Sequence, residues 1–260
     1  MSEAAEVLTH GVLEPEGRLV EASNTTLRCW VTLEGVSLRC VYKPVAGERP
    51  LWDFPDGTLA GREVAAYLVS GQTGWELVPP TVHRGGGPFG PGACQLWIEE
   101  TDEPLVGFVP EDRVPDGWRQ VARARDDRGR AFALAHADDP RLARMAIFDT
   151  VVNNADRKGG HVLVTAAGQL YGVDHGVCFH REPKLRTVLW GWADQPLPEE
   201  AGPVLAGLAE AAAGPLGRAL ANHLTRAEVA ALADRVAGLR AAGRFVAPGG
   251  RWPAMPWPPI

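Results

Sequence analysis

Two short segments combine acidic, basic and glycine residues in a pattern that suits phosphoryl transfer. The first, 153–161, reads NNADRKGGH, and the second, 171–176, reads YGVDHG. A predicted hairpin joins them and can bring Asp156 and Asp174 to the same side of a cleft. Two carboxylates placed there could hold Mg²⁺ and orient a phosphate acceptor. Helix capping and turn formation are the alternative uses of acidic residues at loop edges.

A predicted β-hairpin lies upstream, where strands 27–33 and 36–42 flank the turn residues Glu34 and Gly35. The register that places Cys29 opposite Cys40 gathers the apolar residues of both strands on one face. Lys43 then leaves the second strand on the other face.

The loop before this hairpin contains small and hydroxyl residues, namely Ser23, Asn24 and Thr25. Their backbone N–H groups and side chains could bind phosphate oxygens while Lys43 supplies a positive charge. A surface lysine next to an ordinary turn is the alternative.

Helices and a further strand are expected to position these groups. A helix over 58–70 carries Glu63, which could pair with Lys43 or remain an exposed helical glutamate. The segment 141–152 begins after an acidic residue and Pro140, is mostly apolar, and predicts a buried helix that leads to Asp156. Segments 199–213 and 225–242 predict scaffold helices, the second with a Thr225–Glu228 capping box.

The composition limits the class of protein. The 260 residues are enough for one large domain or two lobes that share a cleft. The formal net charge of −6 argues against nucleic-acid binding. No signal peptide and no membrane-spanning apolar run are visible, so we expect a soluble, cytoplasmic protein without membrane insertion. The four cysteines predict reduced thiols, because they are too few and too scattered for a disulfide framework.

The order of these features resembles the phosphatidylinositol 3-/4-kinase-like (HipA-related) branch of the protein-kinase fold. Residues 41–44 (VYKP) resemble the Lys-Pro strand end of that branch, 153–157 (NNADR) its catalytic loop, and 173–176 (VDHG) its metal loop. The likeness extends from about residue 19 to about residue 179. It is nearest to a small, uncharacterised bacterial family of kinase-like proteins.

The resemblance implies an α+β, two-lobed fold, with an antiparallel-sheet N-lobe over 1–100 and a mainly helical C-lobe over 101–260. It implies a kinase that uses ATP and Mg²⁺, or Mn²⁺, to phosphorylate a hydroxyl on a protein or small molecule. The implied roles are as follows: Lys43 and Glu63 at the α/β-phosphates with the loop Ser23, Asn24 and Thr25; Asp156 at the acceptor hydroxyl; Lys158 at the γ-phosphate; Asp174 at the metal; and Trp97, Ile98 and Glu99 at adenine.

One position departs from the family pattern, which has a second metal ligand, Asn, five residues after the catalytic Asp. Here that position is His161, and imidazole binds Mg²⁺ less well than an amide oxygen does. Three alternatives stay open: a nucleotide-binding pseudokinase, a transferase that moves AMP, and a zinc site formed by His161, His175, Cys178 and His180.

Overall fold

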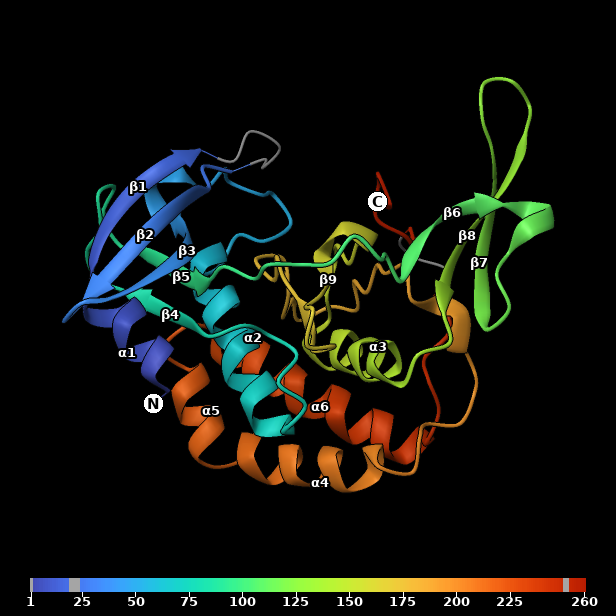
Figure 1. The fold of residues 1–260 in the computed structure, drawn as a ribbon. Coiled ribbons are helices and arrows are strands. Elements are labelled where there is room, and N and C mark those ends of the chain that lie inside the picture. The colour runs from blue at the N-terminus through green and yellow to red at the C-terminus, as the bar shows by residue number, and fades with distance from the viewer. Residues whose placement is uncertain (1, 19–23, 250–252) are drawn as a thin grey trace.

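The computed structural model describes residues 2–18, 24–249 and 253–260, which form two lobes (Figure 1). The smaller lobe is built on a five-stranded antiparallel sheet with the order β1-β2-β3-β5-β4. Its strands are β1 (Val12–Arg18), β2 (Leu27–Leu33), β3 (Val36–Pro44), β4 (Thr81–Arg84) and β5 (Gly92–Leu96).

The β2–β3 hairpin has the predicted register, with Cys29 opposite Cys40 and Leu33 opposite Val36. Glu34 and Gly35 both have positive φ angles, as a two-residue hairpin turn requires. Helix α1 (Glu3–His10) packs on the apolar face, where the two thiols are free and fully buried. Lys43 therefore projects from the opposite face of the sheet.

Helix α2 (Leu59–Thr73) lies below that opposite face and contacts both lobes. The hydroxyl of Thr58 caps it by accepting a hydrogen bond from Gly61 N at 2.9 Å. Ala60 and Val64 pack toward the sheet, while Val69 belongs to the core of the larger lobe. Glu63 lies between these two contacts and is 2% exposed.

The larger lobe contains α3 (Pro140–Val152) and the hairpin β9 (Val162–Val164) and β10 (Leu170–Gly172). Asp139 caps α3, and Asn153 ends it in a left-handed conformation. Helices α4 (Ala201–Ala212), α5 (Pro215–Leu220) and α6 (Arg226–Ala242) lie beneath α2 and α3 (Figure 1). The predicted capping box at the start of α6 is present. These helices bury the apolar side of α3 and so hold the segment that follows it.

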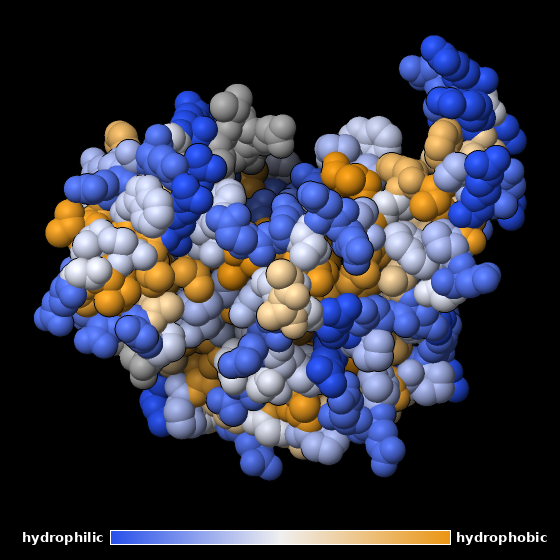
Figure 2. All heavy atoms as spheres, in the orientation of Figure 1, coloured by the Kyte–Doolittle hydropathy of each residue, from blue (hydrophilic) through white to orange (hydrophobic). Residues whose placement is uncertain are grey.

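A three-stranded sheet, which sequence reasoning did not predict, projects from the larger lobe. It has the order β6-β8-β7, from β6 (Val106–Pro110), β7 (Trp118–Arg125) and β8 (Ala131–Ala137). Strand β7 consists largely of alanine and arginine, which are weak strand formers, so its sequence carries little strand signal. The outer end of this sheet is strongly hydrophilic (Figure 2).

Two chain segments make backbone hydrogen bonds with the larger lobe near the β9 hairpin and the residues after Asp156. The segment after β5 reaches the β9 hairpin, where Thr101 N donates to Val164 O at 2.8 Å. The C-terminal segment reaches the residues after Asp156, where Gly159 N donates to Pro259 O at 2.9 Å. Within the described residues, none of the helices is both long and apolar enough to cross a bilayer.

Candidate active site

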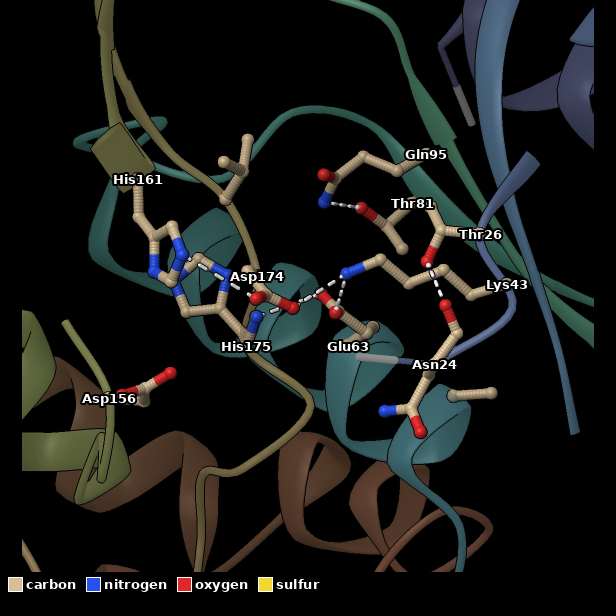
Figure 3. A network of polar contacts seen from close by, with 12 residues as sticks. Asn24, Thr26, Lys43, Glu63, Thr81, Gln95, Asp156, His161, Asp174 and His175 are labelled. Carbon is tan, nitrogen blue, oxygen red and sulfur yellow. Dashed lines mark hydrogen bonds and ion pairs between the residues drawn. The ribbon is translucent and has the colours of Figure 1, made fainter. Parts of the chain in front are cut away.

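Lys43, Glu63 and Asp174 come together between the two lobes (Figure 3). The Lys43 ammonium forms an ion pair with Glu63 and lies 2.9 Å from Asp174 Oδ1. The second oxygen of Glu63 accepts a hydrogen bond from His175 N at 3.0 Å. The predicted Lys43–Glu63 pair is therefore present, and Glu63 also binds the loop that carries Asp174.

The charges in this cluster stabilise one another. Burial alone would lower the pKa of Lys43, but the nearby Asp174 and Glu63 carboxylates outweigh it and raise that pKa above its usual value. The same attraction to Lys43 lowers the pKa of Asp174, which opposes the effect of its desolvation. Both groups are therefore charged across the physiological pH range.

Asp174 has a left-handed backbone conformation, with a φ of 61°. Such a conformation is uncommon for residues other than glycine and needs support from its surroundings. The support comes from neighbouring backbone contacts, since Val173 N donates to His161 O at 3.0 Å and His175 N donates to Glu63. The carboxylate is thus aimed at the cleft from a fixed loop.

Arg157 joins the two predicted loops from within the core. Its guanidinium forms two hydrogen bonds of 2.9 Å with Asp149 on α3, and both side chains are fully buried. It also donates to the carbonyl oxygens of His161 and Val173, each at 3.1 Å, and contacts His175 Nε2 at 2.8 Å. Because one side chain binds both loops, their relative position is held by buried charge-assisted hydrogen bonds.

Asp156 lies on the neighbouring loop, apart from the Lys43 cluster (Figure 3). Its backbone N donates to Asn154 Oδ1 at 2.9 Å, and Asn154 in turn donates to Asp149. The Lys158 ammonium lies 3.1 Å from the Asp156 carboxylate. Burial raises the pKa of Asp156, and Lys158 opposes that rise. Asp156 is therefore a positioned carboxylate that pairs with Lys158.

His161 faces Asp174 across the site, with its Nε2 3.6 Å from Asp174 Oδ2. Burial lowers the pKa of His161 to about 4, so the imidazole is neutral at physiological pH. Its Nδ1 is buried without a hydrogen-bond partner in the described structure. A neutral imidazole beside a carboxylate is a donor set that a divalent cation accepts.

The alternative zinc site is not formed. The His175 ring is bound to Arg157, whereas the His180 ring contacts the backbone of Glu182. Among the residues that the structure describes, no group of three or more His, Cys, Asp or Glu side chains is arranged to hold a metal ion.

The predicted phosphate loop is only partly visible, because Ser23 lies outside the described residues. Thr25 N donates to Gly47 O at 3.1 Å, so this amide is already used within the protein. Asn24 Oδ1 accepts from Arg49 N at 2.8 Å. Thr25 can therefore offer its hydroxyl, and Asn24 its amide NH₂, to a ligand.

The predicted adenine-binding segment follows β5. Trp97 N donates to Arg39 O at 3.0 Å, which extends the pairing with β3 by one residue. Ile98 is half-buried and Glu99 is exposed. Within the described residues, the backbone N–H groups of both form no internal hydrogen bond, so they remain open to a ligand.

Sequence reasoning missed three buried polar residues of this region, which are Arg62, Gln95 and Asp149. Gln95 donates to Thr81 at 2.8 Å beside the cleft, and Arg62 forms an ion pair with Glu228 at 2.6 Å below it. Asp149 carried a usable signal, because it is an acidic residue within the apolar run of α3.

Comparison with solved structures defines the class of fold. The structure of hydra Fam20 with sugar matches with a TM-score of 0.55 and 14% identity, covering 92% of this chain and 87% of that chain. The Golgi casein kinase with Mn/ADP bound matches with a TM-score of 0.54 and 13% identity, covering 92% and 74%. The chain has a two-lobed, kinase-like fold, as predicted; at these identities the likeness concerns the fold alone.

Comparison at the sequence level shows the family. No family model matches the chain. Protein Rv2133c of Mycobacterium tuberculosis (strain ATCC 25618 / H37Rv) is 52% identical over 262 residues, which cover 97% of this chain and 94% of that protein. The chain belongs to the same family as Protein Rv2133c.

Proposed function

We propose that this protein is a kinase that transfers the γ-phosphate of ATP to a hydroxyl group on a protein or small molecule. The observation that supports this most is the cluster in which Lys43 contacts both Glu63 and Asp174, with Asp156 on the adjacent loop. Phosphoryl transfer by a kinase needs a lysine held by a helix glutamate, a carboxylate for the metal and a second carboxylate for the acceptor.

The positions of the described side chains support the proposed roles. Lys43 binds the α/β-phosphates while Glu63 holds its ammonium in place, and Lys158 binds the transferring phosphate. The backbone of Trp97, Ile98 and Glu99 receives adenine, and the loop Ser23, Asn24 and Thr25 covers the phosphates. In the reaction the bond from the γ-phosphorus to ADP breaks, a bond to the acceptor oxygen forms, and Asp156 accepts the hydroxyl proton.

A divalent cation belongs to this proposal, and the side chains fit one. Asp174 offers a carboxylate and His161 a neutral imidazole, which suits Mn²⁺ at least as well as Mg²⁺. When bound, the ion neutralises charge on the phosphate oxygens. The Golgi casein kinase, which shares the fold, holds Mn and ADP. We further propose that the chain represents the phosphatidylinositol 3-/4-kinase-like branch of this fold, with its lobes at 1–100 and 101–260.

The test separates nucleotide binding from transfer. Asp174→Asn should abolish the metal-dependent thermal stabilisation by ATP. Asp156→Asn should keep that stabilisation but lower transfer by about 100-fold or more, as expected on loss of a catalytic acid–base group. Asp127→Asn, in the exposed β7–β8 turn, is the matched control.

Labelled nucleotides distinguish the alternatives. Transfer from γ-labelled ATP supports the proposal, whereas label transferred only from α-labelled ATP indicates an AMP transferase. Nucleotide binding without any turnover indicates a pseudokinase. Full transfer activity in Asp156→Asn would remove Asp156 from the mechanism.

A further inference from the structure

Arg186 lies beside the proposed catalytic loop, and its side chain makes no hydrogen bond or ion pair with the residues that the structure describes. It is partly buried, and its Nε is enclosed without a hydrogen-bond partner. In residues 2–18, 24–249 and 253–260, every other partly buried arginine makes a side-chain hydrogen bond or ion pair. An oxyanion supplied from outside could accept the unused hydrogen bonds of this guanidinium, so the position favours such a ligand.

The backbone of Arg186 is fixed against the residues that flank Asp156. Arg186 N donates to Asn154 O at 2.9 Å, and Arg157 N donates to Arg186 O at 3.0 Å. On the other side, Thr187 N donates to Ala254 O at 3.1 Å. The chain at Arg186 is thus held between the catalytic loop and the C-terminal segment, which keeps its cation near Asp156.

The cations around Asp156 differ in how they contact carboxylates. Lys158 already pairs with Asp156, and Lys43 pairs with Asp174 and Glu63. Arg186 acts on the Asp156 carboxylate only as a further favourable charge. The Arg186 guanidinium therefore acts on Asp156 from a distance and keeps its hydrogen-bond donors unused among the described residues.

We propose that Arg186 recognises the acceptor, and that the acceptor carries a phosphate or carboxylate near the hydroxyl that is phosphorylated. This inference rests on the proposed kinase function. A guanidinium binds either oxyanion through two parallel hydrogen bonds, which fixes the orientation of the group as well as its charge. With the anion held by Arg186, the adjacent hydroxyl is directed toward Asp156.

Matched probes test this proposal and separate the two sources of such an anion. Glycerol 3-phosphate is compared with glycerol, and a short serine peptide flanked by glutamates is compared with its glutamine counterpart. Binding is measured by calorimetry, with and without a non-hydrolysable ATP analogue and Mg²⁺ or Mn²⁺. We expect at least one charged probe to bind about 10-fold or more tightly than its neutral counterpart, as for a charge-assisted hydrogen bond.

The variants assign this preference to Arg186. Arg186→Met should remove it, and Arg186→Lys should keep part of it because the charge remains. Arg181→Met, at an exposed arginine of the same segment, should behave as wild type. Thermal stabilisation by ATP should be unchanged in all three variants, which also shows that they are folded.

Three results would overturn the proposal: equal binding of charged and neutral probes by the wild type, an unchanged preference in Arg186→Met, or weaker ATP binding in that variant. The last result would place Arg186 at the nucleotide. If the wild type neither binds nor turns over ATP, that result counts against the proposed kinase function. The proposal for Arg186 is still tested in that case, because the charged probes are also measured without nucleotide.

Discussion

At the scale of single residues, the proposed function makes His161 the residue that sets which metal the site favours. It stands where the phosphatidylinositol 3-/4-kinase-like branch has Asn. Its neutral ring faces Asp174, with Nε2 3.6 Å from Asp174 Oδ2. An imidazole nitrogen is a softer ligand than an amide oxygen, so this exchange favours Mn²⁺ relative to Mg²⁺. His161 is also the reason to consider a pseudokinase without catalytic activity. One substitution separates altered metal preference from lost catalysis.

We expect His161→Asn to increase the ratio of Mg²⁺-supported to Mn²⁺-supported transfer by about 10-fold, the scale on which changes around a metal site act. The measurement is the rate of transfer from γ-labelled ATP as each metal is titrated. His10→Asn, at an exposed histidine of α1, is the control. An equal loss with both metals would mean that His161 has a role other than setting metal preference.

At the scale of elements, the site depends on the way α3 and α2 anchor the loops. Helix α3 supplies Asp149, which binds Arg157 and, through it, the backbone of both loops. Helix α2 supplies Glu63, which binds Lys43 of β3 and the loop after β10. Two helices thus fix three segments that are far apart in the sequence.

Breaking the Arg157–Asp149 pair should therefore be costly. Arg157→Met leaves Asp149 buried without its cation and should lower the free energy of unfolding by about 3–5 kcal/mol. Arg123→Met breaks the exposed Arg123–Glu111 pair and should lower it by less than about 1 kcal/mol. Urea denaturation measures both changes, and equal values would show that the buried pair does not hold the loops.

At the scale of the whole molecule, the two lobes share a hydrophobic core. Ala65 and Val69 of α2 belong to the same buried cluster as Leu205 of α4 and Leu232 of α6. Because α2 also packs beneath the small sheet, unfolding of either lobe exposes apolar surface of the other.

We therefore expect a single cooperative unfolding transition for the chain, in spite of its two lobes. In scanning calorimetry the calorimetric and van't Hoff enthalpies should agree. Two resolved transitions, with an isolated 101–260 fragment that folds by itself, would contradict the shared core.

The sequence was sufficient for the features that local patterns specify. The alternation of apolar residues and the turn at Glu34–Gly35 determined the β2–β3 register, and with it the face from which Lys43 projects. Capping residues marked the starts of α3 and α6. Strand β7 of the β6-β8-β7 sheet was missed because most of its residues are alanine and arginine, which are neither β-branched nor aromatic.

Other features depend on contacts between segments distant in sequence. The sequence by itself determined the β2–β3 hairpin, the helices α2, α3 and α6, and the polar residues at their ends, because turn, cap and alternation signals act over a few residues. Only the tertiary structure decided that Glu63 is buried between Lys43 and His175, that Arg157 joins both loops, and that the Arg186 side chain makes no hydrogen bond or ion pair with the described residues. A burial or a pairing of this kind depends on which surfaces meet when the helices and sheet pack together.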